Sequence, residues 1–197
     1  MKARTDGRAS FETERLSLSL ARKADRENLI ALERDSEVMR FLNGGRPTPD
    51  DGEAEGASFL TPRGGEDYVW AARETRSGAF VGWFSLRVVQ EGVAELGYRL
   101  RRAAWGKGFA SEGARALVAK GFAEMGLERI VATAMTVHAA SRRVLEKAGL
   151  AYARTVYPDW PDSFPGSELG DVEYEVARDE WEARLSRTAD RSLIRPD

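Results

Sequence analysis

The chain has 197 residues, 42% of them hydrophobic, and its 30 Lys and Arg nearly balance 32 Asp and Glu, for a formal net charge of −2. This length fits one domain with a sizeable core, and the balanced charge provides no basic field for a nucleic acid. The lack of cysteine excludes disulfides, thiolate metal sites and an acyl-cysteine intermediate, and the single histidine excludes a multi-histidine metal site. Because no apolar run is long enough to span a bilayer and residues 1–10 lack the apolar core of a signal peptide, we expect a soluble cytoplasmic protein that binds neither metal nor membrane.

The first part of the chain predicts one strand and two short helices. Leucine alternates with serine over Leu16–Leu20, the period-2 pattern of a half-buried strand. Asp25 can cap a helix that continues to Glu33, and the apolar residues of 38–42 predict a second helix. The glycines and prolines of residues 44–49 then interrupt regular structure.

The rest of the chain alternates strands with two helices. A hairpin is predicted around Ser77 and Gly78, and Gly149 is suited to end the second helix. In order, the predicted elements are strands Tyr68–Glu74, Ala79–Val89 and Val93–Leu100, helix Gly108–Met125, strand Arg129–Met135, helix Ala139–Lys147, and strands Leu150–Tyr157 and Val172–Ala177. We expect a single domain over residues 11–185, with flexible termini at 1–10 and 186–197. This order predicts an α/β fold, a mixed sheet covered by helices.

The segment Trp105–Ala110 is a glycine-rich turn between a predicted strand and a predicted helix. Gly106 and Gly108 lack Cβ atoms, so the backbone can turn tightly and bring its N–H groups close to a ligand. The helix that follows adds unpaired N–H groups and a positive dipole end. Together these features favour an anion site that suits a pyrophosphate, although a glycine turn alone can also serve packing.

Three further stretches accompany this turn in a fixed order: Glu95–Tyr98 before it, Ser111–Gly113 after it, and His138–Leu150 further on. This arrangement resembles the GNAT superfamily of acetyl-CoA-dependent N-acetyltransferases, and within it the RimJ/RimL-like branch that includes the ribosomal-protein N-terminal acetyltransferases. The resemblance runs from Thr13 to Trp181. It implies a mostly antiparallel mixed sheet with helices on both faces, a splayed central strand pair, and acetyl-CoA as co-substrate.

The resemblance also implies which residues hold the cofactor. The pantetheine arm would pair with the backbone of the strand before the glycine turn, and the pyrophosphate with the turn itself. These cofactor residues are Tyr98, Arg99, Leu100, Gly106, Lys107, Gly108, Phe109, Ala110 and Ser111, with His138 near the pantetheine. Trp105 stands where the superfamily commonly has Gln or Arg, and Lys107 is either a phosphate contact or an ordinary solvated lysine.

Acetyl transfer to an amine needs a base for the amine and a donor for the leaving thiolate. Glu95 is predicted to be the base, because Ala94 and Leu96 point to the opposite face of the strand and a carboxylate facing inward is costly unless it has a function. We prefer this role to a salt bridge. Ser141 resembles the serine that the RimJ/RimL-like branch places near the cofactor sulfur, or is a helix N-terminal serine bonded to the backbone. His138 is either structural or a general base.

Residues 157–171 connect the last two strands, where GNAT enzymes form acceptor pockets. Acids of this segment attract cationic amines and its aromatic residues offer flat apolar faces; the alternative is a solubilising loop. The predicted substrate residues are Asp159, Trp160, Asp162, Phe164 and Glu168, and Asp171 adds a further acid.

The expected acceptor is a small cationic amine such as a polyamine or an aminoglycoside-type antibiotic. The stretch Phe41–Pro49 is similar to those of kasugamycin-type aminoglycoside acetyltransferases. A protein N-terminal α-amine is the alternative acceptor, and a non-catalytic acetyl-CoA sensor is the alternative class. A homodimer is compatible with all three.

Overall fold

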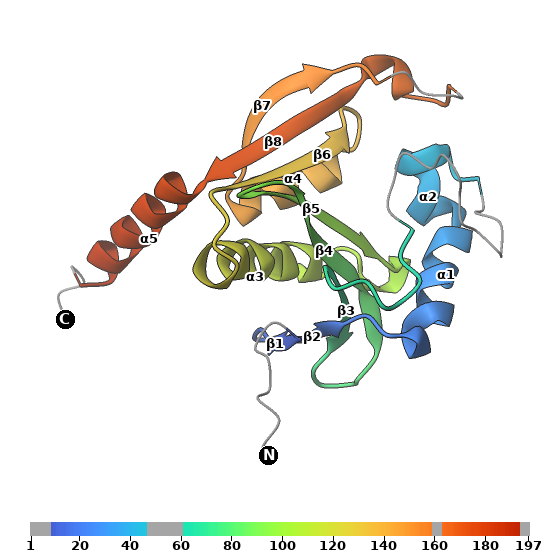
Figure 1. Cartoon of the computed structure of the whole chain (residues 1–197). Coiled ribbons are helices and arrows are strands. Elements are labelled where there is room, and N and C mark those ends of the chain that lie inside the picture. The colour runs from blue at the N-terminus through green and yellow to red at the C-terminus, as the bar shows by residue number, and fades with distance from the viewer. Residues whose placement is uncertain (1–8, 47–60, 159–162, 194–197) are drawn as a thin grey trace.

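A computed structural model of the chain describes residues 9–46, 61–158 and 163–193, with side chains described as far as residue 187. Within these residues eight strands form one sheet in the order β1-β2-β3-β4-β5-β6-β8-β7 (Figure 1). The strands are β1 Ser10–Glu12, β2 Leu16–Leu20, β3 Val69–Glu74, β4 Phe80–Gln90, β5 Val93–Leu100, β6 Arg129–Met135, β7 Ala151–Val156 and β8 Asp171–Ala177. The helices are α1 Arg26–Arg34, α2 Ser36–Asn43, α3 Phe109–Glu124, α4 Ala139–Ala148 and α5 Arg178–Leu193, with short 3-10 turns η1 Lys23–Asp25, η2 Arg102–Ala104 and η3 Ser167–Leu169.

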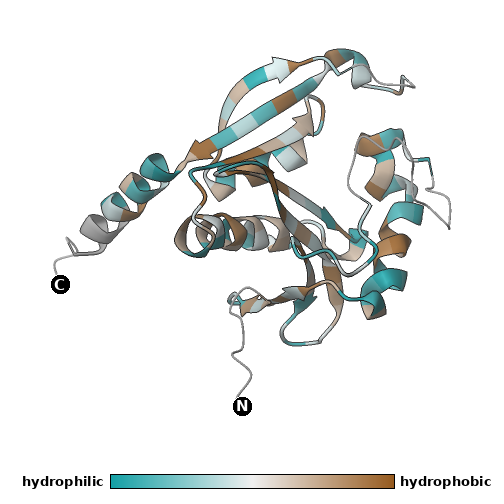
Figure 2. Ribbon diagram, viewed as in Figure 1, coloured by the Kyte–Doolittle hydropathy of each residue, from teal (hydrophilic) through white to brown (hydrophobic). Residues whose placement is uncertain are grey.

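The sheet has helices on both faces, as expected for the mixed α/β fold. One face carries the larger core, in which Phe84, Leu96 and Ile130 of the strands pack with residues of α3 and α4 such as Leu117 and Leu145. We call this the α3–α4 face. Figure 2 shows hydrophobic residues concentrated in the central strands and in α3.

The opposite face carries a smaller core over strands β3 and β4 only. There Leu29 and Leu32 of α1 pack with Val69, Ala71 and Trp83. We call this the α1–α2 face. Along β8, Val172, Tyr174 and Val176 belong to the larger core, so the alternate residues at 171, 173 and 175 lie on the α1–α2 face.

The central pair β5–β6 is the one parallel pair among the strands described, and it is short. Its register joins Val93, Ala94 and Glu95 to Arg129, Ile130 and Val131. Beyond these residues β5 continues beside β4 as far as Leu100, and β6 continues beside β8 as far as Met135. The two strands therefore separate over their C-terminal halves and leave unpaired backbone edges facing each other.

Two elements differ from the sequence prediction. The short strand β1 pairs antiparallel with β2, and the helix α5 extends from β8 and projects away from the sheet (Figure 1). The helix includes Ser186–Leu193, part of the tail that we expected to be loose, and the flexibility of this tail stays a prediction. Within the described residues, none of the helices combines the length and the apolar character that crossing a membrane requires.

Candidate active site

The glycine-rich turn has the backbone that an anion site requires. Gly106 and Gly108 have φ of +72° and +83°, the left-handed region that L side chains rarely adopt. Gly108 is the N-cap of α3, so the first free N–H groups of the helix belong to Phe109, Ala110 and Ser111. A Cβ on Gly106 would meet nothing within 4 Å. The Phe109 side chain is 5% exposed and belongs to the core, which leaves its backbone as the part that can face a ligand.

Arg15 and Glu112 brace this turn, a role that the sequence did not reveal. Arg15 Nη1 donates to the Lys107 carbonyl at 2.9 Å, and its guanidinium pairs with Glu112 at 2.6 Å. Thr13 Oγ1 also donates to Glu112, at 2.6 Å. Partial burial raises the pKa of Glu112, but the hydrogen bonds from Thr13 and Arg15 and the Arg15 charge outweigh it and lower this pKa overall. The carboxylate therefore stays ionised, and a cation stays beside the turn.

The edge of β5 before the turn meets only part of the expectation for the pantetheine arm. Past Glu95 this edge has no strand partner on the β6 side, which fits an extended arm pairing with Tyr98 and Arg99. The Leu100 carbonyl, however, accepts a hydrogen bond from Trp105 Nε1 at 2.8 Å. Trp105 thus fastens the end of β5 to the turn, a structural use for the residue that departs from the superfamily pattern.

Tyr98 and Ser141 form a hydrogen-bonded pair between β5 and the first turn of α4. Their hydroxyl oxygens are 2.8 Å apart, and the tyrosine hydroxyl also lies 3.1 Å from the Ser141 carbonyl, to which it can donate. Burial raises the pKa of Tyr98, an effect that the Ser141 hydrogen bond partly offsets. When Tyr98 donates to Ser141 Oγ, the serine hydrogen is free to point toward a thiolate.

His138 stacks on Phe41 of α2, with ring centroids 4.0 Å apart and planes at 15°. It occupies the N-cap position of α4 but makes no side-chain cap hydrogen bond. Burial lowers the pKa of His138 to about 4, so the imidazole is neutral at pH 7. The stack joins α2 to the loop after β6, and a role of His138 at the cofactor or as a base stays a prediction.

Glu95 lies on the α1–α2 face, opposite to Ala94 and Leu96 as expected, but it is not isolated. Its carboxylate pairs with Arg87 at 2.6 Å, and the glutamate side chain is 35% exposed. Our preference against a salt bridge at this residue was therefore wrong, because Arg87 is its register partner on β4. The role of Glu95 as base stays a prediction.

A buried ionic cluster holds α1 against the same face. Glu33 accepts two hydrogen bonds from Arg63, at 2.7 and 2.9 Å, and lies 3.8 Å from Arg99. The Arg99 guanidinium stacks over Trp83 at 5.2 Å. Burial lowers the pKa of Arg99 to about 10, against the attraction of Glu33. The Arg99 side chain thus anchors α1, and its contribution to a cofactor site would come from the backbone.

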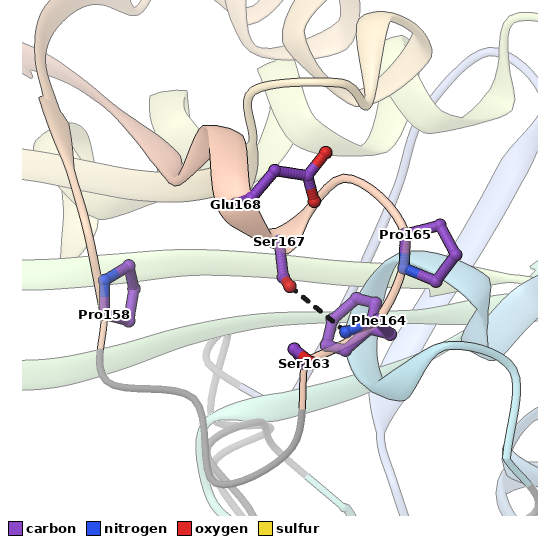
Figure 3. Close-up of a pocket in the computed structure, with 6 residues that line it drawn as sticks. All are labelled: Pro158, Ser163, Phe164, Pro165, Ser167 and Glu168. Atoms are coloured by element: carbon purple, nitrogen blue, oxygen red, sulfur yellow. Dashed lines mark hydrogen bonds between the residues drawn. The ribbon is translucent and has the colours of Figure 1, made fainter.

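The β7–β8 connection forms a pocket of about 550 Å³, shown in Figure 3, with described walls made by Pro158, Ser163, Phe164, Pro165, Ser167 and Glu168. Phe164 is only 9% exposed, and a Cβ on Gly44 would lie 2.8 Å from its Cβ, so this loop docks on the end of α2. The carboxylate of Glu168 accepts from Gly166 N–H at 2.9 Å. The expected open aromatic face at Phe164 is thus a largely buried wall. Asp159, Trp160 and Asp162 lie outside the described residues.

Comparisons with known proteins identify the family. A family model described as an acetyltransferase (GNAT) domain matches residues 15–151. The chain is 32% identical over 186 residues to the FsC-acetyl coenzyme A-N(2)-transacetylase of Aspergillus fumigatus, covering 87% of this chain and 77% of that protein. This chain therefore belongs to the GNAT acetyltransferases and is an N-acetyltransferase.

Solved structures at low sequence identity share the fold. Spermidine N-acetyltransferase from Vibrio cholerae, solved with CoA and spermine, matches with a TM-score of 0.68 at 13% identity, over 86% of this chain and 99% of that one. RimL, a ribosomal L7/L12 α-N-protein acetyltransferase solved with CoA, matches with a TM-score of 0.66 at 17% identity, over 85% and 97%. Both neighbours were solved with CoA bound.

Proposed function

We propose that this protein transfers the acetyl group of acetyl-CoA directly to a primary amine of a small cationic molecule, such as a polyamine or an aminoglycoside-type compound. The observation that carries the proposal is the separation of β5 from β6 beside the left-handed glycines at the start of α3. A pyrophosphate at Gly106–Ser111 would direct the arm along the free edge of β5. The thioester would then lie in the gap between the strands, open to the α1–α2 face.

In this reaction the amine nitrogen attacks the acetyl carbon, a C–N bond forms, and the C–S bond breaks to release the CoA thiolate. Glu95 would take the proton of the ammonium group, directly or through water, with Arg87 holding its carboxylate in place. Ser141, oriented by Tyr98, would donate a hydrogen bond to the thiolate. Backbone N–H groups near Gly97 and Tyr98 would stabilise the tetrahedral oxyanion.

The part of the α1–α2 face beside the strand gap, here called the open face, carries Glu95, Glu173 and Glu175, each paired with an arginine. The cationic character of the acceptor is supported by the names of two similar proteins. The relative from A. fumigatus is named as an N(2)-transacetylase, and a fold neighbour as a spermidine N-acetyltransferase.

The test is a CoA-release assay over spermidine, kanamycin and a peptide with a free N-terminal serine. We expect turnover with spermidine or kanamycin that far exceeds the background hydrolysis of acetyl-CoA. Turnover with the peptide alone would replace this proposal by protein N-terminal acetylation. Binding of acetyl-CoA without turnover on any amine would favour a sensor.

A further inference from the structure

Asp171 differs from the other acids of the open face. It is 7% exposed, and its buried Oδ1 has no hydrogen-bond partner in the structure as described. The other described acids on this face of β5 and β8 pair with arginines: Glu95 with Arg87 at 2.6 Å, Glu173 with Arg154 at 2.6 Å, and Glu175 with Arg129 at 3.6 Å. Burial raises the pKa of Asp171 above its ordinary value. Among the described residues, Asp171 Oδ1 is thus a buried carboxylate oxygen without a hydrogen-bond partner.

The sheet register places Asp171 beside the open end of the strand gap. It is the first residue of β8, opposite Met135 at the end of β6 and Val156 at the end of β7. Directly opposed residues share a face, and this is the α1–α2 face. Because neighbouring strands lie about 4.8 Å apart, Asp171 stands one strand beyond the edge of β6 that faces the gap.

The residues just before β8 pack against the end of β6, next to Asp171. Thr136 donates through its N–H to Gly170 O and through its hydroxyl to Leu169 O, each at 2.9 Å. A Cβ on Gly166 would lie 2.7 Å from a Val137 methyl, so the loop packs closely on the end of β6. Pro158 follows Val156 by two residues, Ser167 precedes Asp171 by four, and Val156 and Asp171 are register partners. Pro158 and Ser167 line the pocket shown in Figure 3.

We infer that Asp171 binds a second, non-reacting ammonium group of the acceptor, so that the enzyme selects di- and polyamines over monoamines. This inference rests on the proposed function. Asp171 lies across β6 from the gap, too far along the sheet to hold the nitrogen that attacks a thioester there. Its distance from the gap-facing edge of β6, roughly one strand spacing, suits a cation a few carbons away from that nitrogen. A buried carboxylate oxygen without a hydrogen bond destabilises the folded protein, and a bound cation with N–H donors would remove this penalty.

The experiment compares Asp171→Asn with Glu173→Gln, two variants that each remove one negative charge from the same face of the same strand. Each is assayed with spermidine, kanamycin and propylamine. For Asp171→Asn we expect the KM of the preferred polycation to rise about 10- to 100-fold, the loss of a charged hydrogen bond, with little change in kcat or in the KM of propylamine. Glu173→Gln should change these KM values by less than about twofold.

A stability measurement separates ligand binding from a structural role. Since burial raises the folded-state pKa of Asp171, its ionised form opposes folding at neutral pH, so Asp171→Asn should leave the Tm of the free protein unchanged or raised. Four outcomes would overturn the inference and leave the proposed function intact. They are a lower Tm for Asp171→Asn, an unchanged KM for polycations in Asp171→Asn, an equal KM effect in Glu173→Gln, and a wild type that uses propylamine as well as spermidine. A wild type that acetylates none of the amines would reject both.

Discussion

The Glu33 cluster gives a stability prediction with a calculable size. Glu33 is 1% exposed and holds Arg63 at 2.7 Å, with Arg99 at 3.8 Å. Glu33→Gln keeps the shape of the side chain and removes the negative charge between two guanidiniums. Removing one partner of a buried ion pair costs about 3–5 kcal/mol. For a domain of this size about 1 kcal/mol corresponds to 2–4 °C in Tm, so we expect Tm to fall by roughly 6–20 °C.

Calorimetry or circular dichroism would measure this Tm, with Glu175→Gln as the matched control. Glu175 and Arg129 are about half exposed and 3.6 Å apart, and an exposed pair contributes at most about 1 kcal/mol. A Glu33 variant that loses no more than the control would refute the reasoning, because it would mean that solvent or other groups stabilise both arginines without Glu33.

Three further predictions concern the site. Gly108→Asp should weaken acetyl-CoA binding at least about tenfold by calorimetric titration. The control is Gly126→Asp, which should leave binding unchanged, because Gly126 has a similar φ of +70° but lies beyond the end of α3. Equal losses of binding in the two variants would point to unfolding. Tyr98→Phe and Ser141→Ala should show a coupling of roughly 0.5–3 kcal/mol in kcat, and additive effects would exclude a joint role. Because the pKa of His138 is lowered to about 4, the unfolded state binds its proton first, and the free energy of unfolding should decline as pH falls from about 6.5 toward 4. His138→Phe should reduce that decline in urea titrations at pH 7 and 5, and an unchanged decline would assign it to other groups.

The elements that the sequence predicted well are those whose pattern is local. Val93–Leu100 and Arg129–Met135 were predicted with the bounds that the structure has, because both are β-branched or alternating runs with clear breaks. The three-residue β1 is too short for a period to show, and its pairing with β2 depends on tertiary contact. The helix α5 has a polar sequence in which Trp181 is an aromatic contact with the core, through Phe122. The pattern of its residues from Ser186 on therefore resembled a loose tail.

In the candidate site, too, the local features could be predicted and the long-range contacts could not. The glycine turn could be predicted because strand, glycines and helix follow one another along the chain. The ion pair of Glu95 depends on the register of the β4–β5 hairpin, and Arg87 lies eight residues before it; a register argument across this hairpin could have found it. The contact of Arg15 with Glu112 spans 97 residues, and the stack of His138 on Phe41 joins elements that no sequence pattern connects.

The difference between local and long-range features affects how far the proposed cofactor half and acceptor half of the site can change without unfolding the protein. In the proposed function the cofactor half would lie in one continuous stretch from β5 to α4, and its opposite surface is the large core, where a changed side chain creates a cavity or a clash. The proposed acceptor half would be assembled from α1, α2, β7, β8 and the β7–β8 connection. Apart from the buried Glu33 cluster, it carries exposed ion pairs worth at most about 1 kcal/mol each. Pairs such as Arg154 with Glu173, whose side chains are 69% and 32% exposed, can therefore be altered without unfolding the domain. Asp171, which is buried and whose Oδ1 has no hydrogen-bond partner among the described residues, is the position of this face where we expect the acceptor's charge to matter most.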